Sequence, residues 1–551
     1  MTVALVLASC AKQGMPSGGP KDETPPQVLR LTPEERTRGF DGSAFEIAFD
    51  EYVVLKDAEN NILVSPPMRQ KPDYKVKGKR LVVQLNDSLT PNTTYLFQFV
   101  GAIADFTEGN PLPALEYVFS TGSYIDSMTV RGSVTDALTQ EPHKEAVSVW
   151  LYTPEEYEQL LLSLSDTAVA CPKPRYATRC DKEGAFAFNY ISPGAYRCVA
   201  VVDEDKSLTV SATETVAFGD SLLTAYGMSD SVAVDSTRRY CEADSHRVQL
   251  YYFSPNRAQQ RITGSGFKRR GQLTVSTLLP MRDPSVESGG EALVWRLNAT
   301  RDTMSLWTLR EACDSLRLIV SDTTGLHDTL TMKYTHRKMP GGMGLQPPTA
   351  MKLNPKKLPY YDTLWLSTST PFDTARCRCD SAVAVLNAAD SSRRYCQVLI
   401  DSTWLRAALL FPFRAGGKYV IDVHKNCFYN LYGRALDSLH AEISVTEPEE
   451  YGTLNLTVTS AVTEALLVEL LTEQGKVLQQ RRAAASGPLQ FAHLQPGKYR
   501  IRAIVDANGN GAWDEGDLGA QRQPERVVYM PKTLEVRANW EYNEELVIRV
   551  P

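Results

Sequence analysis

The chain has 551 residues, of which 43% are hydrophobic, and a formal net charge of −6 at pH 7. This length suffices for roughly three to five domains, and the hydrophobic fraction is typical of folded globular domains. The slightly negative charge gives no general electrostatic attraction to nucleic acid, and no apolar run approaches the roughly 18 residues of a membrane-spanning helix.

The N-terminal segment is a short apolar run, residues 3–7, that ends in the tetrapeptide Leu7-Ala8-Ser9-Cys10. The tetrapeptide resembles a bacterial lipobox. This implies that residues 1–9 are a truncated signal peptide and that lipidation at Cys10 anchors the mature chain to a membrane. The usual positive segment ahead of the apolar run is missing, which favours a start codon further upstream. The alternative is a chance match in an unstructured N-terminus.

Beyond a Gly- and Pro-rich tether at residues 10–23, the pattern is that of short strands. Residues 45–49, 81–85 and 95–99 alternate between apolar and polar side chains, and turn residues separate them. Alternating strands with frequent turns are typical of β-sandwiches. Residues 154–165 predict the one helix. We therefore expect an all-β protein of several sandwiches in tandem.

A family resemblance rests on residues 21–26, 45–51, 64–67 and 117–121. These segments resemble the bacterial Ig-like domain named after S-layer protein A, expected here at residues 24–122. The lipobox, the tether and this domain, in that order, resemble a family of Bacteroidota outer-membrane lipoproteins. The resemblance implies an outer-membrane location through the lipid anchor, on either the periplasmic face or the cell surface.

Internal repeats indicate a modular build. Residues 184–197 align without gaps to residues 487–500, and their pattern of Gly, Phe, Pro-Gly and Tyr is similar to the regulatory, transthyretin-like domain of carboxypeptidases. That resemblance implies a noncatalytic sandwich. In a weaker repeat, Tyr95 and Gly109 match Tyr419 and Gly433 at the same offset, which predicts a second, degenerate Ig-like unit.

Together these observations predict five sandwiches behind the tether. Their expected bounds are 24–122 (Ig-like), 126–240 (carboxypeptidase-regulatory-like), 241–336 (sandwich of unknown type), 349–450 (degenerate Ig-like) and 451–551 (transthyretin-like).

The last sandwich contains a candidate metal loop. Its oxygen-bearing side chains are Asp506, Asn508, Asn510, Asp514 and Asp517. They fall at positions 1, 3, 5, 9 and 12 of an EF-hand loop, with Gly511 at the turn position, which points to calcium. Aspartate at position 12 is shorter than the usual glutamate, and no helices flank the loop, so a hairpin that binds no metal is the alternative. The counterpart after Asp203 lacks the glycine and most of the ligands.

The cysteines and tryptophans predict packing more than chemistry. Of the ten cysteines, nine remain besides Cys10. The short spacing of Cys171 and Cys180 would allow a disulfide across a loop, whereas small buried thiols are the alternative. Trp150, Trp295, Trp307 and Trp365 lie in strand patterns, which favours the core over sugar-stacking positions.

Enzyme signatures are absent from the sequence: it has no G-x-S-x-G, H-E-x-x-H, Walker or C-x-x-C motif. We therefore expect a noncatalytic protein. The resemblance to Bacteroidota outer-membrane lipoproteins implies a scaffold or accessory subunit for envelope proteins, such as those of an outer-membrane assembly or export machine. The alternative is a surface adhesin that binds glycans or host proteins. Exposed aromatic residues gathered on loops would favour the adhesin, and a large apolar patch without aromatics would favour docking to proteins.

Overall fold

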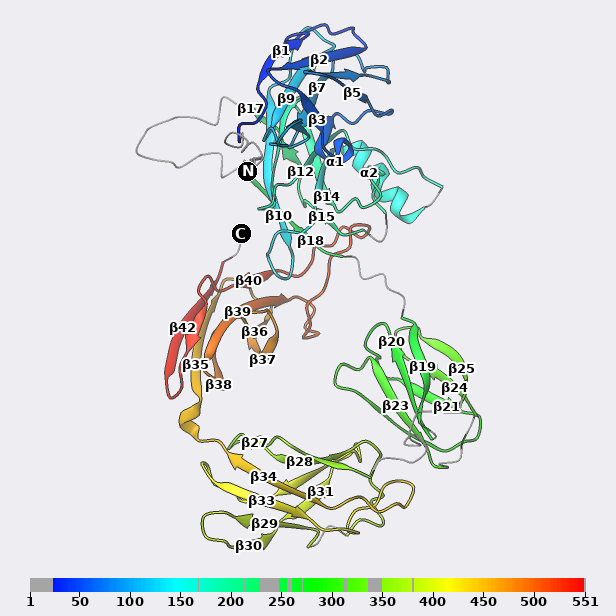
Figure 1. Cartoon of the computed structure of the whole chain (residues 1–551), viewed down its shortest axis with the longest axis vertical. Helices are drawn as coiled ribbons and strands as arrows, with labels where there is room; N and C mark the ends of the chain where they lie inside the picture. Colours follow the sequence, from blue (N-terminus) through cyan, green and yellow to red (C-terminus); the bar gives the residue numbers. More distant parts are fainter. Residues whose placement is uncertain are drawn as a thin grey trace, which may run out of the picture. The chain divides into compact units, whose positions relative to one another are not determined.

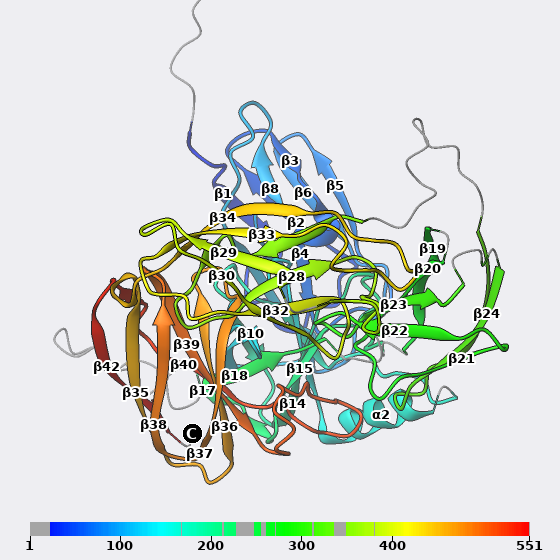
Figure 2. The same cartoon turned by 90° about the horizontal axis from the view of Figure 1, so that it is seen from below.

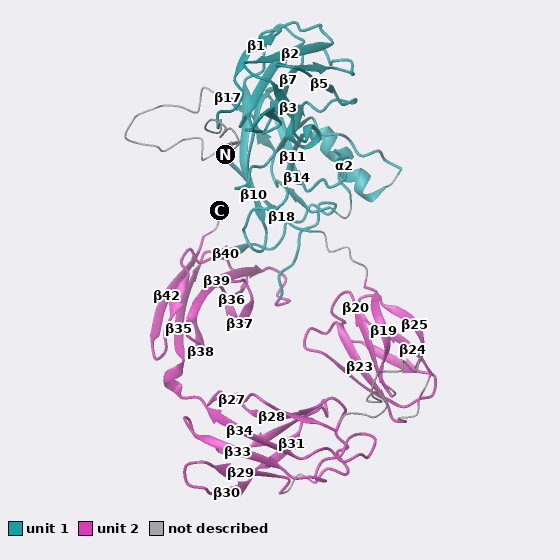
Figure 3. Ribbon diagram, viewed as in Figure 1, with its two compact units in different colours: residues 1–256, 512–527 teal, residues 257–511, 528–551 magenta. Residues whose placement is uncertain are grey.

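In the computed structural model, the described residues are 23–549 apart from 167, 212–213, 228–246, 255–259, 270, 311–312, 314, 335–348 and 379–380. They form β-sheets almost throughout (Figures 1 and 2), which confirms the expected all-β class. The chain divides into two compact units, residues 1–256 with 512–527 and residues 257–511 with 528–551 (Figure 3). No helix in the described part of the chain is long and apolar enough to cross a membrane.

The first sandwich of the first unit is built from two main sheets. One has the order β1 (Val28–Thr32), β2 (Ala44–Phe49), β6 (Arg80–Gln84), β5 (Asp73–Lys77); the other has β4 (Ile62–Ser65), β7 (Thr94–Phe99), β9 (Leu115–Ser120). A short pair, β3 (Val53–Leu55) and β8 (Ile103–Asp105), and the one-turn helix α1 (Ala58–Asn61) complete it. Phe45, Phe97 and Phe119 pack between the two sheets, because alternation points every second side chain inward.

The second sandwich of this unit also has two sheets. One contains β13 (Ala185–Ile191), β10 (Met128–Asp136), β17 (Tyr226–Gly227) and β18 (Arg247–Tyr252); the other contains β12 (Tyr176–Arg179), β11 (Ser148–Tyr152), β14 (Ala195–Val201), β15 (Val216–Phe218) and β16 (Leu223–Thr224). Helix α2 (Pro154–Ser165) has the predicted bounds and contacts β11 and β14.

The predicted boundary after residue 240 is wrong, because β18 pairs in parallel with β10 and therefore belongs to the second sandwich. Leu250 and Tyr252 are buried in its core, so the alternating pattern that was assigned to the third sandwich completes the second. The first unit accordingly runs to Asn256 before the chain enters the second unit.

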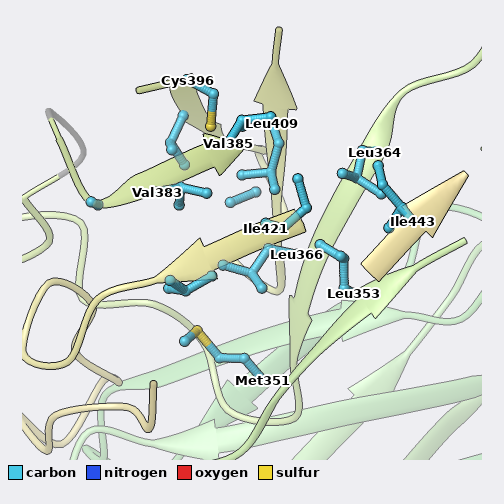
Figure 4. Close-up of a cluster of buried hydrophobic side chains, with 14 of the residues drawn as sticks. Met351, Leu353, Leu364, Leu366, Val383, Val385, Cys396, Leu409, Ile421 and Ile443 are labelled. Carbon is cyan, nitrogen blue, oxygen red and sulfur yellow. The ribbon is translucent and has the colours of Figure 1, made fainter. Parts of the chain in front are cut away.

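The second unit begins with a sandwich of two sheets. One has the order β19 (Ile262–Arg269), β20 (Gln272–Thr277), β23 (Thr303–Thr308), β22 (Leu293–Leu297); the other has β21 (Ser285–Ser288), β24 (Ser315–Ser321), β25 (His327–Lys333). The next sandwich has β26 (Met351–Asn354), β28 (Leu364–Thr368), β32 (Arg406–Leu410), β31 (Gln397–Ile400) against β27 (Lys357–Leu358), β34 (Leu439–Val445), β33 (Lys418–Val423), β29 (Val383–Asn387), β30 (Arg393–Tyr395). Figure 4 shows the core of the latter, in which Leu366 and Ile421 are fully buried.

This fourth sandwich repeats the strand order of the first: β26-β28-β32-β31 matches β1-β2-β6-β5, and β34-β33-β29 matches β9-β7-β4. The repeated tyrosine has the same role in both. The hydroxyl of Tyr95 accepts a hydrogen bond of 2.9 Å from the N–H of Thr90, and the hydroxyl of Tyr419 accepts one of 3.0 Å from the N–H of Arg414.

The last sandwich repeats the second. One sheet has the order β38 (Gly487–Leu494), β35 (Gly452–Ser460), β42 (Glu541–Ile548). The other has β37 (Val477–Ala484), β36 (Ala465–Thr472), β39 (Gly497–Asp506), β40 (Val527–Tyr529), and β41 (Leu534–Val536) also pairs with β39. β42 runs parallel to β35 as β18 does to β10. Tyr196 and Tyr499 each donate a hydrogen bond to the carbonyl oxygen four residues earlier, at 2.9 and 2.6 Å.

The disulfide that the spacing of Cys171 and Cys180 allows is not formed. Cys171 packs with Trp150 on one face of the β12-β11-β14-β15 sheet, whereas Cys180 packs with the core cluster on the other face. Burial raises the pKa of Cys180 to about 12 and that of Cys396 to about 11, so both stay protonated at neutral pH and act as small apolar side chains.

Candidate functional site

The predicted calcium loop begins where β39 ends. Asp506 is 3% exposed, and its Oδ2 accepts a hydrogen bond of 2.8 Å from the N–H of Gly511. Its Oδ1 is buried without a hydrogen-bond partner. Gly511 has a φ of 78°, which glycine adopts without strain. Burying an unpartnered carboxylate oxygen is costly, so a cation at Oδ1 would stabilise the loop.

The other candidate ligands are divided between the two units. Asn508 and Asn510 accompany Asp506 in the second unit, and the Oδ1 of Asn508 accepts a hydrogen bond of 2.9 Å from the N–H of Asn510. The guanidinium of Arg482 packs against Gly511, and its positive charge opposes a cation there. Calcium binding by this loop stays a prediction.

The remaining ligands, Asp514 and Asp517, belong to the first unit. The N–H of Asp514 donates to Oε2 of Glu525 at 3.2 Å, and Oδ1 of Asp517 accepts from the N–H of Ala520 at 3.1 Å. Cys10, the predicted lipidation site, lies outside the described residues.

Residues 512–527 pack on the second sandwich, a relationship that the sequence analysis missed. Leu518 is 5% exposed and shares a buried cluster with Trp150 and Phe253. Gln523 donates from Nε2 to the carbonyl oxygen of Phe218 at 2.8 Å and to Oδ1 of Asp220 at 2.6 Å. The signals available in the sequence were Trp513 and Leu518, two large apolar side chains in a largely polar loop.

A second acidic group lies in the loop after β14, where the sequence analysis discounted a metal site. The carboxylates of Asp203, Asp205 and Glu214 lie within 4.8 Å of one another. Burial and the nearby charges raise the pKa of Glu214. Burial likewise raises the pKa of Asp203, whereas hydrogen bonds from Ser207 lower that of Asp205. The sequence did not indicate this group, because Glu214 lies outside the segment that repeats between the second and fifth sandwiches.

A cavity of about 450 Å³ lies between the first and second sandwiches of the first unit. Its apolar lining includes Ile62, Met68 and Trp150, and its charged lining includes Arg179 and Asp203. Burial lowers the pKa of Arg179, and the guanidinium donates a hydrogen bond to the carbonyl oxygen of Asn60. The cavity is large enough for a small ligand.

Aromatic side chains gather where the fourth and fifth sandwiches meet. Tyr361 stacks on His493 with ring centroids 3.7 Å apart and an interplanar angle of 12°, and Tyr360 and Tyr451 pack edge-on or tilted against this pair. Tyr361 is 46% exposed. On the fifth sandwich, Trp540 is 55% exposed. Of the four tryptophans that the strand patterns predict in the core, Trp150 and Trp307 are buried, whereas Trp295 and Trp365 are partly exposed.

Comparison with known proteins identifies one part of the chain. Residues 22–121 match the family of the bacterial Ig-like domain, which confirms the expected N-terminal domain. This match covers the first sandwich alone. A search of curated proteins finds no match.

Solved structures similar to the chain are multidomain proteins at low identity. The TIE protein of Bacillus anthracis is 8% identical, with a TM-score of 0.14, over 97% of this chain and 76% of that one. BcpA, the major pilin subunit of Bacillus cereus, is 9% identical, with a TM-score of 0.14, over 76% and 98%. SGBP-B of Bacteroides ovatus, solved with a mixed-linkage heptasaccharide, is 9% identical, with a TM-score of 0.18, over 66% and 87%. At these scores the similarity carries no functional argument.

Proposed function

We propose that this protein is a noncatalytic outer-membrane lipoprotein that holds envelope proteins together. The supporting observation is the order of its parts. The Ig-like match begins at residue 22, behind a lipobox that ends at Cys10 and a Gly- and Pro-rich tether that begins there. A lipid at Cys10 would keep the sandwiches at the membrane surface, where their loops and strand edges could contact other proteins.

Membrane fractionation tests the anchor. Wild type and Cys10→Ala are expressed in the native host with the full upstream coding region, and labelled with a fatty acid. We expect the wild type in the outer-membrane fraction with label, and the variant without label. Cys396→Ala is the matched control, because it removes a buried thiol of the fourth sandwich. Label that persists in Cys10→Ala would contradict the anchor.

Purification from native membranes in mild detergent, followed by mass spectrometry, tests the scaffold role. A near-stoichiometric outer-membrane barrel would support a subunit of an assembly or export machine. Recovery of the protein alone would contradict the scaffold and favour the second candidate.

The second candidate is an adhesin that binds glycans or host proteins at the cell surface. The observation that favours it is the set of exposed aromatics on the second unit, with Tyr361 46% and Trp540 55% exposed. Exposed aromatic rings with polar neighbours are typical of recognition surfaces.

A further inference from the structure

The outer face of the β38-β35-β42 sheet carries a row of three side-chain amides. Burial alternates along β35, so that Leu454, Leu456 and Val458 point into the core and Asn455 points outward. The Nδ2 of Asn455 donates to Oδ1 of Asn543 on β42 at 3.1 Å, and its Oδ1 accepts from Nε2 of Gln490 on β38 at 3.0 Å. The row therefore crosses all three strands in a fixed orientation.

These amides keep hydrogen-bonding capacity for a ligand. An amide group carries two N–H donors and an oxygen with two lone pairs, and the row uses only one N–H each of Gln490 and Asn455. A shallow hollow of about 460 Å³ lies over the row. Its lining is uncharged: Asn455, Leu456, Thr457, Pro488, Leu489, Gln490 and Asn543.

The aromatic cluster lies at the end of the same face. Tyr451 immediately precedes β35, four residues before Asn455, which is about 13 Å at ~3.3 Å per residue, and it is buried among the aromatic rings. His493 lies in the irregular register of β38 opposite this end of β35 and stacks on Tyr361. His493 covers one face of the Tyr361 ring and Tyr360 and Tyr451 pack edge-on against Tyr361, yet Tyr361 remains 46% exposed.

An aromatic ring beside a row of amides matches the surface chemistry of a sugar. The C–H groups on one face of a pyranose pack on an aromatic ring, and its hydroxyl groups donate to and accept from amides. The neighbouring exposed carboxylates of Glu541 and Glu545 repel an anionic glycan. A second sheet of the same chain would need apolar side chains to interdigitate, and this face is polar.

We propose that the outer face of the β38-β35-β42 sheet binds a neutral oligosaccharide, with one sugar ring stacked on Tyr361 and the following hydroxyl groups bonded to Gln490, Asn455 and Asn543. This inference rests on the second candidate function and gives it a site and a ligand class.

Calorimetric titration of the full chain tests the site, with cellohexaose, laminarihexaose, xylohexaose and mannohexaose as separate probes. We expect at least one probe to bind. We expect Tyr361→Ala and Asn543→Ala each to weaken its binding about tenfold or more, which corresponds to the loss of a stacked ring or a hydrogen bond at about 1.4 kcal/mol per factor of ten. Tyr361→Trp, which keeps an aromatic face, should retain binding.

The matched control is Tyr395→Ala, which removes a tyrosine that is 56% exposed on β30 of the fourth sandwich and should leave affinity unchanged. If a probe binds equally to wild type, Tyr361→Ala and Asn543→Ala, the glycan-binding function stands and this site is wrong. If none of the probes binds the wild type, both the site and its neutral-glycan ligand class are overturned. A dimer in light scattering that Asn543→Ala dissociates would overturn the proposal in favour of a second copy.

Discussion

The side-chain amide of Gln523 donates a hydrogen bond of 2.8 Å to the carbonyl oxygen of Phe218, a residue that precedes it by 305 positions. Together with Leu518, which lies in the buried cluster around Trp150, it joins residues 512–527 to the second sandwich. The second sandwich therefore completes its packing with a segment that the sequence assigns to the fifth.

Removing the buried leucine of this segment should loosen the second sandwich. We expect Leu518→Ala to destabilise the packing by about 2–5 kcal/mol, because it leaves a cavity beside Trp150 and Phe253. Faster hydrogen exchange in peptides from β11 and β15 would report the loss. Leu478→Ala is the control, because Leu478 is 46% exposed. Unchanged exchange in Leu518→Ala would contradict the docked position of residues 512–527.

The fifth sandwich contains a buried ion pair whose disruption should be severe. Arg502 donates from Nε to Oε2 of Glu469 at 2.6 Å, and both residues are buried. Gln480 and Tyr529 supply further hydrogen bonds to the pair. We expect Glu469→Ala to cost about 3–5 kcal/mol, because it leaves the guanidinium buried without its counterion.

Hydrogen exchange in β36 and β39 measures this effect locally, which is preferable to a global midpoint in a chain of several domains. The control is Glu464→Ala, at an exposed position beside β36. Equal exchange rates in the two variants would show that the ion pair contributes little.

The acidic group after β14 should give a pH-dependent stability. The pKa of Glu214 is raised in the folded protein, so the stability associated with its protonated form is present below the unfolded pKa and is lost as the pH rises through the folded pKa. At pH 7 its charge is therefore unfavourable. We expect Glu214→Gln to stabilise the second sandwich by about 0.5 kcal/mol at pH 7, after allowing for solvent screening, and to have no such effect near pH 4.

Thermal unfolding at both pH values, combined with hydrogen exchange in β14 and β15, checks this expectation. Glu204→Gln, at an exposed position in the same loop, controls for the change in net charge. A stabilisation of Glu214→Gln that is equal at both pH values would argue against electrostatic repulsion as its cause.

Calcium binding is best tested on the full chain, because the loop runs into residues 512–527, which pack on the second sandwich. We expect calcium to bind with a dissociation constant on the order of 10⁻⁴–10⁻³ M, as in extracellular modules, and Asp506→Asn to abolish the heat of binding. Asparagine retains an oxygen that can accept from Gly511, so the loop should keep its shape. Asp205→Asn is the matched control. Binding lost in the control but kept in Asp506→Asn would move the site to the acidic group after β14.

The sequence predicts local structure well where a side chain forms a hydrogen bond with residues close to it in the chain. The helix at residues 154–165 is signalled by Thr153 and Glu156, which form its capping box. The tyrosine anchors Tyr196 and Tyr499 mark sandwiches with one topology.

Contacts between residues far apart in the chain cannot be predicted from the sequence in the same way. Alternation along residues 247–252 predicts a strand but not that it pairs with β10, more than a hundred residues earlier. The proximity of Glu214 to Asp203 depends on how one long loop folds back on itself, and that of Tyr361 to His493 on how two sandwiches meet. Periodicity defines which face of a strand is buried and says nothing about which distant segment covers it.

The packing of residues 512–527 on the second sandwich also sets an order of events during synthesis. A chain that emerges from its N-terminus presents residues 126–256 long before Leu518 and Gln523 follow. During that interval the apolar surface around Trp150 and Phe253 lacks its last cover, and it is open to chaperones and proteases. The second sandwich can therefore bury this surface only after residues 512–527 have been synthesised. A chain truncated before them would leave the surface exposed, and this distinguishes it from a complete chain.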